Sequence, residues 1–495
     1  MAVVEGAELT SRTKEFLSSN RKLLINGDWV DAASGKTFSV TDPATGDELC
    51  QVAEGAKEDI DRAVKAARAA FESGPWAEMT PNVRSKLLWK LSQLIEENAD
   101  TFAELETLDN GKALSISKAV DIPASIENFQ YMAGWATKID GRLMTLSMPN
   151  THAYTLREPV GVVGQIIPWN FPMLMAAWKL APALAVGCTV VLKPAEQTPL
   201  TALLLGELIT EAGFPPGVVN VISGFGETAG AAIAEHPDVD KVAFTGSTEV
   251  GKIILRAASG NLKKVSLELG GKSPNVVFAD ANLEAAVGGA ATGIFFNQGQ
   301  VCCAGSRLFI EKKAFDNVVG GLSDVAAGMN VAPGMDAACE MGPLVSDVQL
   351  QRVTDLVEQG KKDGATAVVG GEPVGGNGYF YKPTILTDTK PDMSVIKEEI
   401  FGPVVTAIPF EDPNEIVAHA NDTEYGLAAG IWTRDISKAH ATARAIKAGT
   451  VWINCYNAFD PHMPFGGYKQ SGIGREMGPE VLDLYTEVKS VCVAL

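Results

Sequence analysis

The chain has 495 residues, of which 46% are hydrophobic and 20% charged, and its formal net charge at pH 7 is −19. This length exceeds what one hydrophobic core usually serves, so we expect two or three domains. The negative charge argues against nucleic acid and anionic membranes as partners, because both attract basic surfaces. The seven cysteines form no C-x-x-C motif, which argues against a disulfide framework or structural zinc.

The first 160 residues contain helical patterns and one candidate hairpin. The segment from Met1 to Asn20 has no apolar run, so no signal peptide is predicted, and we expect the protein in the reducing cytoplasm. Residues 58–72 and 82–97 carry apolar side chains at helical spacing. The segment 141–158 is predicted to form a β-hairpin.

From residue 160 onward, short β-branched runs alternate with helical segments. The strands expected are 162–167, 189–193, 218–222, 241–245 and 264–268, and the helices expected are 198–213, 226–235 and 248–258. Such alternation is typical of a parallel sheet with helices on both faces. A second region of this kind opens with a strand at 275–278 and runs to about residue 470. The fold class predicted is therefore α/β, with two doubly wound parallel-sheet domains.

The most apolar stretch, 173–192, is about as long as a membrane span. It is interrupted by Lys179, Pro182 and Gly187, so we interpret it as a buried helix followed by a buried strand. A short strand-like tail follows the second region at 488–493. An exposed terminal strand often pairs with another subunit, which indicates a homo-oligomer.

Two glycine-bearing loops each follow a predicted strand. Gly246 and Ser247 open a helix, whose free N–H groups can hold a pyrophosphate. The loop Gly224–Gly230 is close to the dinucleotide fingerprint, but its last glycine comes one residue too late. Taken alone, either loop is more often a tight turn than a phosphate site.

Lys193 ends a predicted buried strand, and Glu196 follows three residues later. A carboxylate at this place can accept hydrogen bonds from both ribose hydroxyls and would repel a 2′-phosphate, which favours NAD over NADP. An ordinary surface ion pair after a strand explains the same residues equally well. Asn170, between Trp169 and Phe171, also has two readings: an amide that donates to a developing oxyanion, or a turn asparagine beside a proline.

Glu268 and Cys302 each lie in a glycine-bearing motif, Glu268–Lys272 and Gly299–Cys303. A thiol is a good nucleophile and a carboxylate a good base for water, and acyl transfer through a thioester needs both. The flanking glycine predicts a loop that exposes the thiol among N–H groups, which favours the thiolate. A cysteine is otherwise most often a small buried apolar residue. The five histidines show no metal-ligand spacing, so neither a metal nor a histidine-based triad is expected.

From about residue 20 to the C-terminus, the chain resembles the aldehyde dehydrogenase superfamily. The matching motifs, in order, are Pro168–Asn170, Lys193–Glu196, Phe244–Ser247, Glu268–Lys272, Gly299–Cys302, Glu399–Pro403 and Pro464–Lys469. The number and order of these motifs make chance agreement negligible. The chain is also similar to bacterial phenylacetaldehyde dehydrogenases, at Gly299–Cys302 and at the ending Lys489–Val493.

The resemblance implies an NAD-dependent enzyme that oxidises an aldehyde to an acid through a thioester. Cys302 would attack the aldehyde, Asn170 and the Cys302 N–H would hold the oxyanion, and Glu268 would activate water. Lys179 matches the family's active-site lysine and would relay protons. The cofactor-binding positions implied are Ile166, Trp169, Lys193, Glu196, Gly226, Gly230, Phe244, Gly246, Ser247, Val250, Gly251, Leu269, Glu399 and Phe401.

The substrate tunnel implied by the resemblance is apolar and contains no Lys or Arg. Its positions are Phe171, Met175, Trp178, Phe296, Val301, Cys303, Phe459 and Phe465. The substrate expected is an uncharged hydrophobic aldehyde, phenylacetaldehyde-like, with a medium-chain aliphatic aldehyde as the alternative. A CoA-acylating enzyme is a rival, against which Glu268 argues. A non-catalytic structural relative is another, and the intact Cys302, Glu268 and Asn170 argue against it.

The resemblance also implies the domain limits. Residues 1–140 and 159–268 would form the NAD-binding domain, and 269–478 the catalytic domain. Residues 141–158 and 479–495 would form an oligomerisation element, with a tetramer favoured over a dimer.

Overall fold

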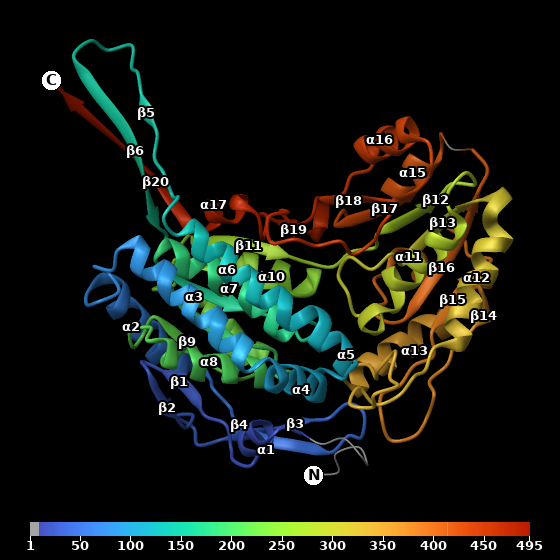
Figure 1. Cartoon of the computed structure of the whole chain (residues 1–495), viewed down its shortest axis with the longest axis horizontal. Helices are drawn as coiled ribbons and strands as arrows, with labels where there is room; N and C mark the ends of the chain where they lie inside the picture. Colours follow the sequence, from blue (N-terminus) through green and yellow to red (C-terminus); the bar gives the residue numbers. More distant parts are fainter. Residues whose placement is uncertain (1–8, 413) are drawn as a thin grey trace.

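The computed structural model describes residues 9–412 and 414–495, which form an α/β body with a projecting arm (Figure 1). The first eight residues of the expected NAD-binding domain lie outside the described residues. The largest sheet has eight strands in the order β19-β11-β10-β7-β8-β9-β1-β2. Its five central strands are parallel: β11 (Lys264–Glu268), β10 (Lys241–Thr245), β7 (Val162–Ile166), β8 (Thr189–Lys193) and β9 (Val219–Val221).

Antiparallel strands flank this parallel core, namely β19 (Gly472–Ile473) at one end and β1 (Leu23–Ile25) with β2 (Asp28–Val30) at the other. The predicted α/β class is confirmed, but the sheet is mixed and mostly parallel, not wholly parallel. The sequence missed β1 and β2, and also the separate hairpin of β3 (Thr37–Thr41) and β4 (Glu48–Ala53). These strands are short, and β3 buries only one of its five side chains, so they carry little apolar pattern.

Helices cover both faces of the eight-stranded sheet, and alternate strand residues face them. Val190 and Leu192 join the core formed with α7 (Pro172–Val186) and α8 (Leu200–Ala212), whereas Val191 packs with α2 (Lys57–Glu72) on the opposite face. Every residue of α7 is buried, which confirms the predicted buried helix followed by a buried strand. Among the described residues, no helix is both long enough and apolar enough to cross a membrane.

The second sheet has seven strands in the order β14-β15-β16-β13-β12-β17-β18, all parallel except for β14. The strands are β12 (Pro274–Val277), β13 (Arg307–Glu311), β14 (Thr366–Val369), β15 (Thr384–Thr387), β16 (Val404–Phe410), β17 (Ala428–Trp432) and β18 (Thr450–Ile453). From β12 the chain passes through α11 (Leu283–Phe295) and the short helix η3 (Phe296–Gly299) to Cys302. This sheet therefore delivers the thiol, while the first sheet delivers Glu268.

The remaining helices surround these sheets (Figure 1). They are α1 (Ser11–Leu17), α3 (Pro81–Glu97), α4 (Ala99–Asn110), α5 (Leu114–Ile116), η1 (Ser117–Asp121), α6 (Ile122–Trp135), η2 (Gly226–Gly230), α9 (Ala231–Glu235), α10 (Thr248–Ala258), η4 (Lys312–Ala314), α12 (Phe315–Gly328), α13 (Asp347–Lys362), α14 (Ser394–Lys397), α15 (Ile416–Asn421), α16 (Ile436–Ala445), η5 (Lys469–Ser471), η6 (Pro479–Val481) and α17 (Leu482–Tyr485).

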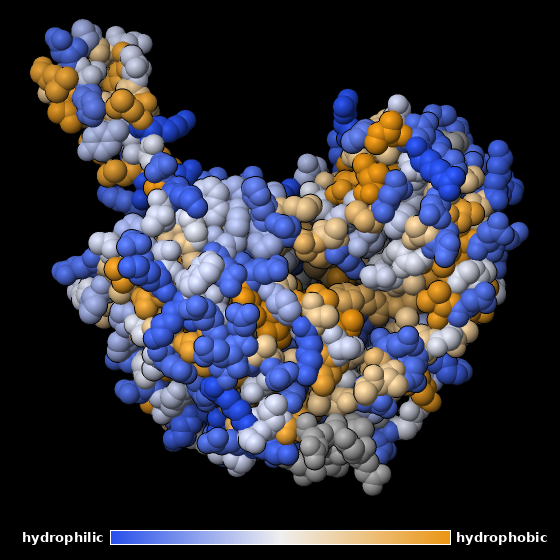
Figure 2. Space-filling model, viewed as in Figure 1, coloured by the Kyte–Doolittle hydropathy of each residue, from blue (hydrophilic) through white to orange (hydrophobic). Residues whose placement is uncertain are grey.

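The arm is an antiparallel three-stranded sheet in the order β20-β6-β5. The predicted hairpin is present as β5 (Leu143–Met144) and β6 (Thr151–Pro159), and the C-terminal strand β20 (Thr486–Ala494) pairs along the whole of β6. Hydrophobic side chains gather on the arm (Figure 2). Those exposed are Leu143, Met148, Leu156, Val488, Val493 and Leu495. The role of this arm in oligomerisation remains a prediction.

Candidate active site

An apolar tunnel and a more polar groove meet inside the body. Four residues line both of them: Asn170, Thr245, Glu268 and Cys302. In Figure 2 the face of the body is hollowed near its middle, and hydrophobic residues gather around the hollow. The junction is the place where a compound in the tunnel and one in the groove would come into contact. It contains three of the four residues predicted to be catalytic.

Strand ends explain how three of these four residues come together. Strands β7, β10 and β11 are parallel neighbours, and Thr245 and Glu268 are register partners at the ends of β10 and β11. Asn170 follows the end of β7 by four residues. The carboxyl ends of parallel strands share one edge of the sheet, which is where ligands bind in such folds. Cys302 approaches this edge from the second sheet, so the fold closes the gap of 34 residues between it and Glu268.

The tunnel encloses about 810 Å³ of space outside protein atoms, including its open mouth. All eight positions expected for the substrate line it. Their aromatic rings pack together, with centroids 5.5 Å apart for Trp178 and Phe465 and 6.0 Å apart for Phe171 and Phe296. The sequence reasoning missed further lining residues: Val120, Ala124, Glu127, Leu174, Asn457, Asp460, Pro461 and Met477. Leu174 shares a helix face with Phe171 and Trp178, a spacing that could have revealed it.

The groove holds about 1280 Å³ of space outside protein atoms, including open solvent. Five of the expected cofactor positions line it: Trp169, Gly246, Ser247, Glu399 and Phe401. The sequence reasoning missed the other lining residues, namely Pro168, Thr248, Glu249, Gly270, Gln349, Arg352, Glu398 and Tyr425. Several of these come from elements far apart in the chain, so no single motif could have grouped them.

The other expected cofactor positions do not line the groove itself, but most pack beside one another. A Cβ atom on Gly230 would lie 3.8 Å from Lys193 Cδ and 4.0 Å from Ile166 Cδ1. Lys193 Nζ lies 3.0 Å from Glu196 Oε2. The ring of Phe244 lies against Gly246, and Leu269 lies against Gly251. Gly226 opens η2, and Val250 is an exposed residue of α10.

Glu399 is fixed by the glycines of the Glu268–Lys272 motif. Its Oε1 accepts a hydrogen bond of 2.8 Å from the N–H of Gly271. A Cβ atom on Gly270 would lie only 2.2 Å from Glu399 Oε2, so any larger residue at 270 would displace the Glu399 carboxylate. Burial raises the pKa of Glu399 to about 7.

A sequence model of the aldehyde dehydrogenase family matches residues 29–491. The chain belongs to this family. Aldehyde dehydrogenase 1A1 of Gallus gallus is 52% identical over 484 residues, which cover 97% of this chain and 95% of that protein. The mitochondrial aldehyde dehydrogenase of Homo sapiens is 52% identical over 474 residues, 95% of this chain and 92% of that protein. A solved NAD+ complex of aldehyde dehydrogenase from Bacillus cereus is 55% identical, with a TM-score of 0.98 and 99% coverage of both chains.

In this aldehyde dehydrogenase, Glu268 is buried without a hydrogen-bond partner. Its side chain is 2% exposed, and neither carboxylate oxygen has a partner among the described residues. Burial raises the pKa of Glu268 well above its usual value, and the neighbouring Cys302 raises it further. Both effects favour the protonated form of this carboxyl group.

The pKa of the Cys302 thiol differs from what the sequence predicts. Interaction with the Cys303 thiol, followed by burial, raises the pKa of Cys302 well above its usual value. The expectation of a favoured thiolate was therefore wrong for this state of the aldehyde dehydrogenase. Low-dielectric surroundings disfavour the charged form of a thiol, and the sequence could not show how deeply the loop is covered.

Lys179 lies behind the junction and does not line the tunnel or the groove. Its Nζ donates a hydrogen bond of 2.6 Å to Thr245 Oγ1 and forms a buried ion pair with Glu476. Thr245 in turn lines the junction with Glu268. Glu476 comes from the C-terminal part of the chain, and the sequence reasoning missed it because it carries no motif of its own.

These pKa shifts predict how the aldehyde dehydrogenase depends on pH. A carboxylate can serve as a base, and a thiol as a nucleophile, only when ionised. Because both pKa values are raised, both ionised fractions increase as the pH rises above neutrality. We expect kcat and kcat/KM to increase from about pH 7 to about pH 9. A steady-state pH–rate profile checks this, and activity that falls over this interval would contradict it.

Proposed function

We propose that the protein oxidises an uncharged hydrophobic aldehyde to the carboxylic acid with NAD, through a thioester on Cys302. The observation that carries this proposal is the junction, where an apolar tunnel meets the groove at Cys302, Glu268 and Asn170. A nucleophile, a base and an amide donor stand there together, which is what acyl transfer through a covalent intermediate needs. The relative from Bacillus cereus, solved as an NAD+ complex, supports the choice of cofactor.

The residues of the groove, together with Lys193 and Glu196 outside its lining, fit a dinucleotide. Gly246 and the N-cap residue Ser247 stand at the start of α10, an 11-residue helix whose N–H groups suit a pyrophosphate. Lys193 and Glu196 suit the adenosine ribose, and the carboxylate of Glu196 would repel a 2′-phosphate. Glu399 and Phe401 are assigned to the nicotinamide ribose and ring. When bound, the nicotinamide supplies an acceptor for one hydride.

The other expected cofactor positions are assigned to the adenine site and to the walls of the groove. Gly226 and Gly230 would flank the adenine, and Trp169 stands edge-on to Phe401 with ring centroids 5.2 Å apart. The remaining positions, which support the walls of the groove, are Ile166, Phe244, Val250, Gly251 and Leu269.

Cys302 begins the reaction. Its thiol loses a proton to solvent, and the sulfur attacks the carbonyl carbon of an aldehyde in the tunnel. A C–S bond forms, and the carbonyl π electrons move to oxygen. The amide of Asn170 and the N–H of Cys302 hold this oxyanion, and one such donor contributes roughly 10²- to 10³-fold in rate. Collapse of the oxyanion would transfer a hydride to the acceptor that a bound nicotinamide supplies, and leave a thioester on Cys302.

Glu268 completes the reaction. The ionised carboxylate takes a proton from water, whose oxygen attacks the thioester carbon. The C–S bond then breaks, the acid leaves, and the Cys302 sulfur departs as a thiolate. Lys179, between Thr245 and Glu476, is assigned the transfer of the proton away from the junction, because its Nζ contacts both residues.

The tunnel favours uncharged hydrophobic substrates. Its lining contains no Lys or Arg, and two exposed acids, Glu127 and Asp460, line it as well. An aldehyde with a distal carboxylate would meet repulsion there and find no counter-charge. The aromatic rings support a phenylacetaldehyde-like substrate. A medium-chain aliphatic aldehyde is the alternative, because Leu174, Met175 and Val301 offer equally apolar walls.

We further propose the predicted domain division, with residues 1–140 and 159–268 binding NAD and residues 269–478 providing catalysis. Residues 141–158 and 479–495, which form the arm, are assigned to a homo-oligomer, with a tetramer favoured over a dimer. The support for this assignment is the set of exposed hydrophobic side chains on the arm, since exposed apolar surface often marks contacts between subunits.

A substrate panel tests the proposed function. We expect NADH formation without CoA from acetaldehyde, hexanal, benzaldehyde and phenylacetaldehyde. The value of kcat/KM should increase about 10- to 10²-fold from acetaldehyde to phenylacetaldehyde, because more apolar surface is buried in the tunnel. 4-Carboxybenzaldehyde should be at least about 10-fold poorer than benzaldehyde.

The alternatives give different results in the same panel. Strict dependence on CoA would identify the CoA-acylating rival. A preference for hexanal over every aromatic aldehyde would select the aliphatic alternative. Betaine aldehyde, added to the panel, should be a poor substrate, and a preference for it would contradict the uncharged substrate class. No NADH from any aldehyde would indicate a non-catalytic relative.

A further inference from the structure

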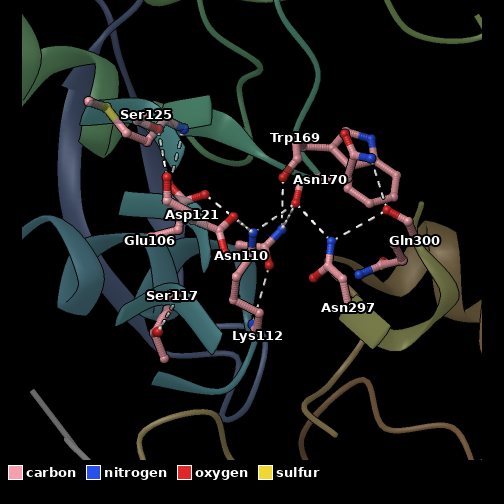
Figure 3. A network of polar contacts seen from close by, with 12 residues as sticks. Glu106, Asn110, Lys112, Ser117, Asp121, Ser125, Trp169, Asn170, Asn297 and Gln300 are labelled. Carbon is pink, nitrogen blue, oxygen red and sulfur yellow. Dashed lines mark hydrogen bonds and ion pairs between the residues drawn. The ribbon is translucent and has the colours of Figure 1, made fainter. Parts of the chain in front are cut away.

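A buried ionic cluster lies directly behind the proposed oxyanion donor (Figure 3). Lys112 follows α4 and has no exposed side-chain surface. Its Nζ lies 2.6 Å from Asp121 Oδ1 and 3.3 Å from Glu106 Oε1, and both of these carboxylates are also fully buried. Asp121 is the last residue of η1, a π-helical segment, and such segments occur frequently at functional sites.

The cluster is bonded to the loop that carries Asn170. Lys112 Nζ donates a hydrogen bond of 3.0 Å to the backbone carbonyl of Asn170. Asn297 Nδ2 donates to the same carbonyl at 2.9 Å, and Asn110 Nδ2 donates to the carbonyl of Trp169 at 2.8 Å (Figure 3). The backbone on both sides of the Asn170 peptide is therefore held by buried side chains.

Two further hydrogen bonds fix the loop that carries Asn170. Glu106 Oε2 accepts a hydrogen bond of 3.1 Å from the N–H of Met173, in the first turn of α7. On the opposite side, the Asn170 side chain donates its own hydrogen bond of 2.9 Å to the carbonyl of Gln300. The loop is thus fixed from Trp169 to Met173, and the Asn170 amide is held next to the segment that carries Cys302.

Burying these three charged side chains costs free energy, so stabilisation of the fold alone is a poor explanation for the cluster. Burying charges carries a desolvation penalty, and an apolar replacement of a buried ion pair is often neutral or stabilising. A charge-assisted hydrogen bond is, however, directional and stronger than a neutral one. Catalytic groups must be held within roughly 0.5 Å of their productive positions. A rigid ammonium donor on the Asn170 carbonyl meets this requirement.

We propose that Lys112 is a positioning residue for the oxyanion donor. Asp121 and Glu106 hold its ammonium group, which fixes the carbonyl of Asn170 and so orients the amide of the same residue. This proposal rests on the proposed function, in which that amide binds the oxyanion. The neighbouring Val120 lines the tunnel, so η1 links the cluster to the substrate wall as well.

A double-mutant cycle with Asn170→Ala tests this role. Lys112→Met removes the ammonium group that donates to the Asn170 carbonyl. Asp121→Asn removes the negative charge that pairs with Lys112, with little change of side-chain shape. Each variant should lower the rate of thioester formation about 10-fold, less than the roughly 10²- to 10³-fold expected for Asn170→Ala, while KM changes less than about twofold. In the Asn170→Ala background, either change should have almost no further effect, because no amide remains to be oriented.

Ser117→Ala is the matched control. Ser117 is buried near the cluster, and its hydroxyl contacts Thr107 Oγ1 at 2.9 Å, away from the Asn170 loop. The rate of thioester formation in Ser117→Ala should therefore stay within about twofold of wild type. Lys112→Arg should restore part of the lost rate by keeping a cationic donor. If Lys112→Met does not fold, the cycle with Asp121→Asn decides alone. If Lys112→Met or Asp121→Asn lowered the rate of thioester formation by the same factor in wild type and in Asn170→Ala, the positioning role would be overturned. No NADH from the wild type would overturn the proposed function and this proposal with it.

Discussion

Cys302→Ala is expected to lower kcat for aldehyde oxidation by about 10⁴-fold or more, because it removes the group that we propose forms the covalent intermediate. Cys302 is partly buried at the junction of tunnel and groove, where only a small side chain is lost. Binding of NAD should persist, with a Kd within about threefold of wild type, since the cofactor residues are untouched. Absorbance of NADH measures the first effect, and calorimetric titration with NAD measures the second.

Cys455→Ala is the control for this change, because Cys455 is an exposed free cysteine outside the tunnel and the groove. It should keep wild-type activity. Full activity of Cys302→Ala would transfer the nucleophile role to Cys303, whose buried thiol is the nearest substitute. Loss of NAD binding in Cys302→Ala would instead mean that the variant damages the groove.

Glu268→Gln should slow hydrolysis of the thioester by about 10²- to 10⁴-fold, the range for loss of a general base. Formation of the thioester should be affected much less, so the variant should release a burst of about one NADH per subunit and then turn over slowly. The substitution keeps the shape of a side chain that is 2% exposed, and it removes the group whose pKa is raised. Stopped-flow absorbance separates the burst from the steady state.

Glu284→Gln, on the exposed surface of α11, is the matched control and should behave as wild type. An unchanged steady-state rate in Glu268→Gln, together with a burst equal to that of wild type, would exclude Glu268 as the base. If the burst disappeared entirely, Glu268 would be acting in the first half of the reaction, by taking the Cys302 proton.

Much of the first sheet could be predicted from the sequence. Strands β8, β10 and β11 have the bounds expected from their β-branched runs, and β7 ends one residue earlier than expected. Thr245 and Glu268 end neighbouring strands, so their meeting at one edge follows from the topology alone. The N-terminal strands were missed because each has only three to six residues, which is too short to show a clear apolar pattern.

The meeting of Glu268 with Cys302 could not be derived from periodicity, because it depends on how the second sheet packs against the first. The cluster of Lys112, Asp121 and Glu106 was missed for another reason. Charged residues are almost never fully buried unless they are paired, so a sequence pattern reads them as surface positions. Only the structure shows that these three side chains share one buried site behind Asn170.

The central claim is that oxidation passes through an acyl group on the sulfur of Cys302. The most direct measurement is mass spectrometry of Glu268→Gln, mixed with NAD and phenylacetaldehyde, quenched in acid during the burst and digested. The account predicts the mass of a phenylacetyl group on the peptide that contains Cys302, located on Cys302 and absent without NAD. An NADH burst without any adduct, or an adduct located on Cys303, would contradict it.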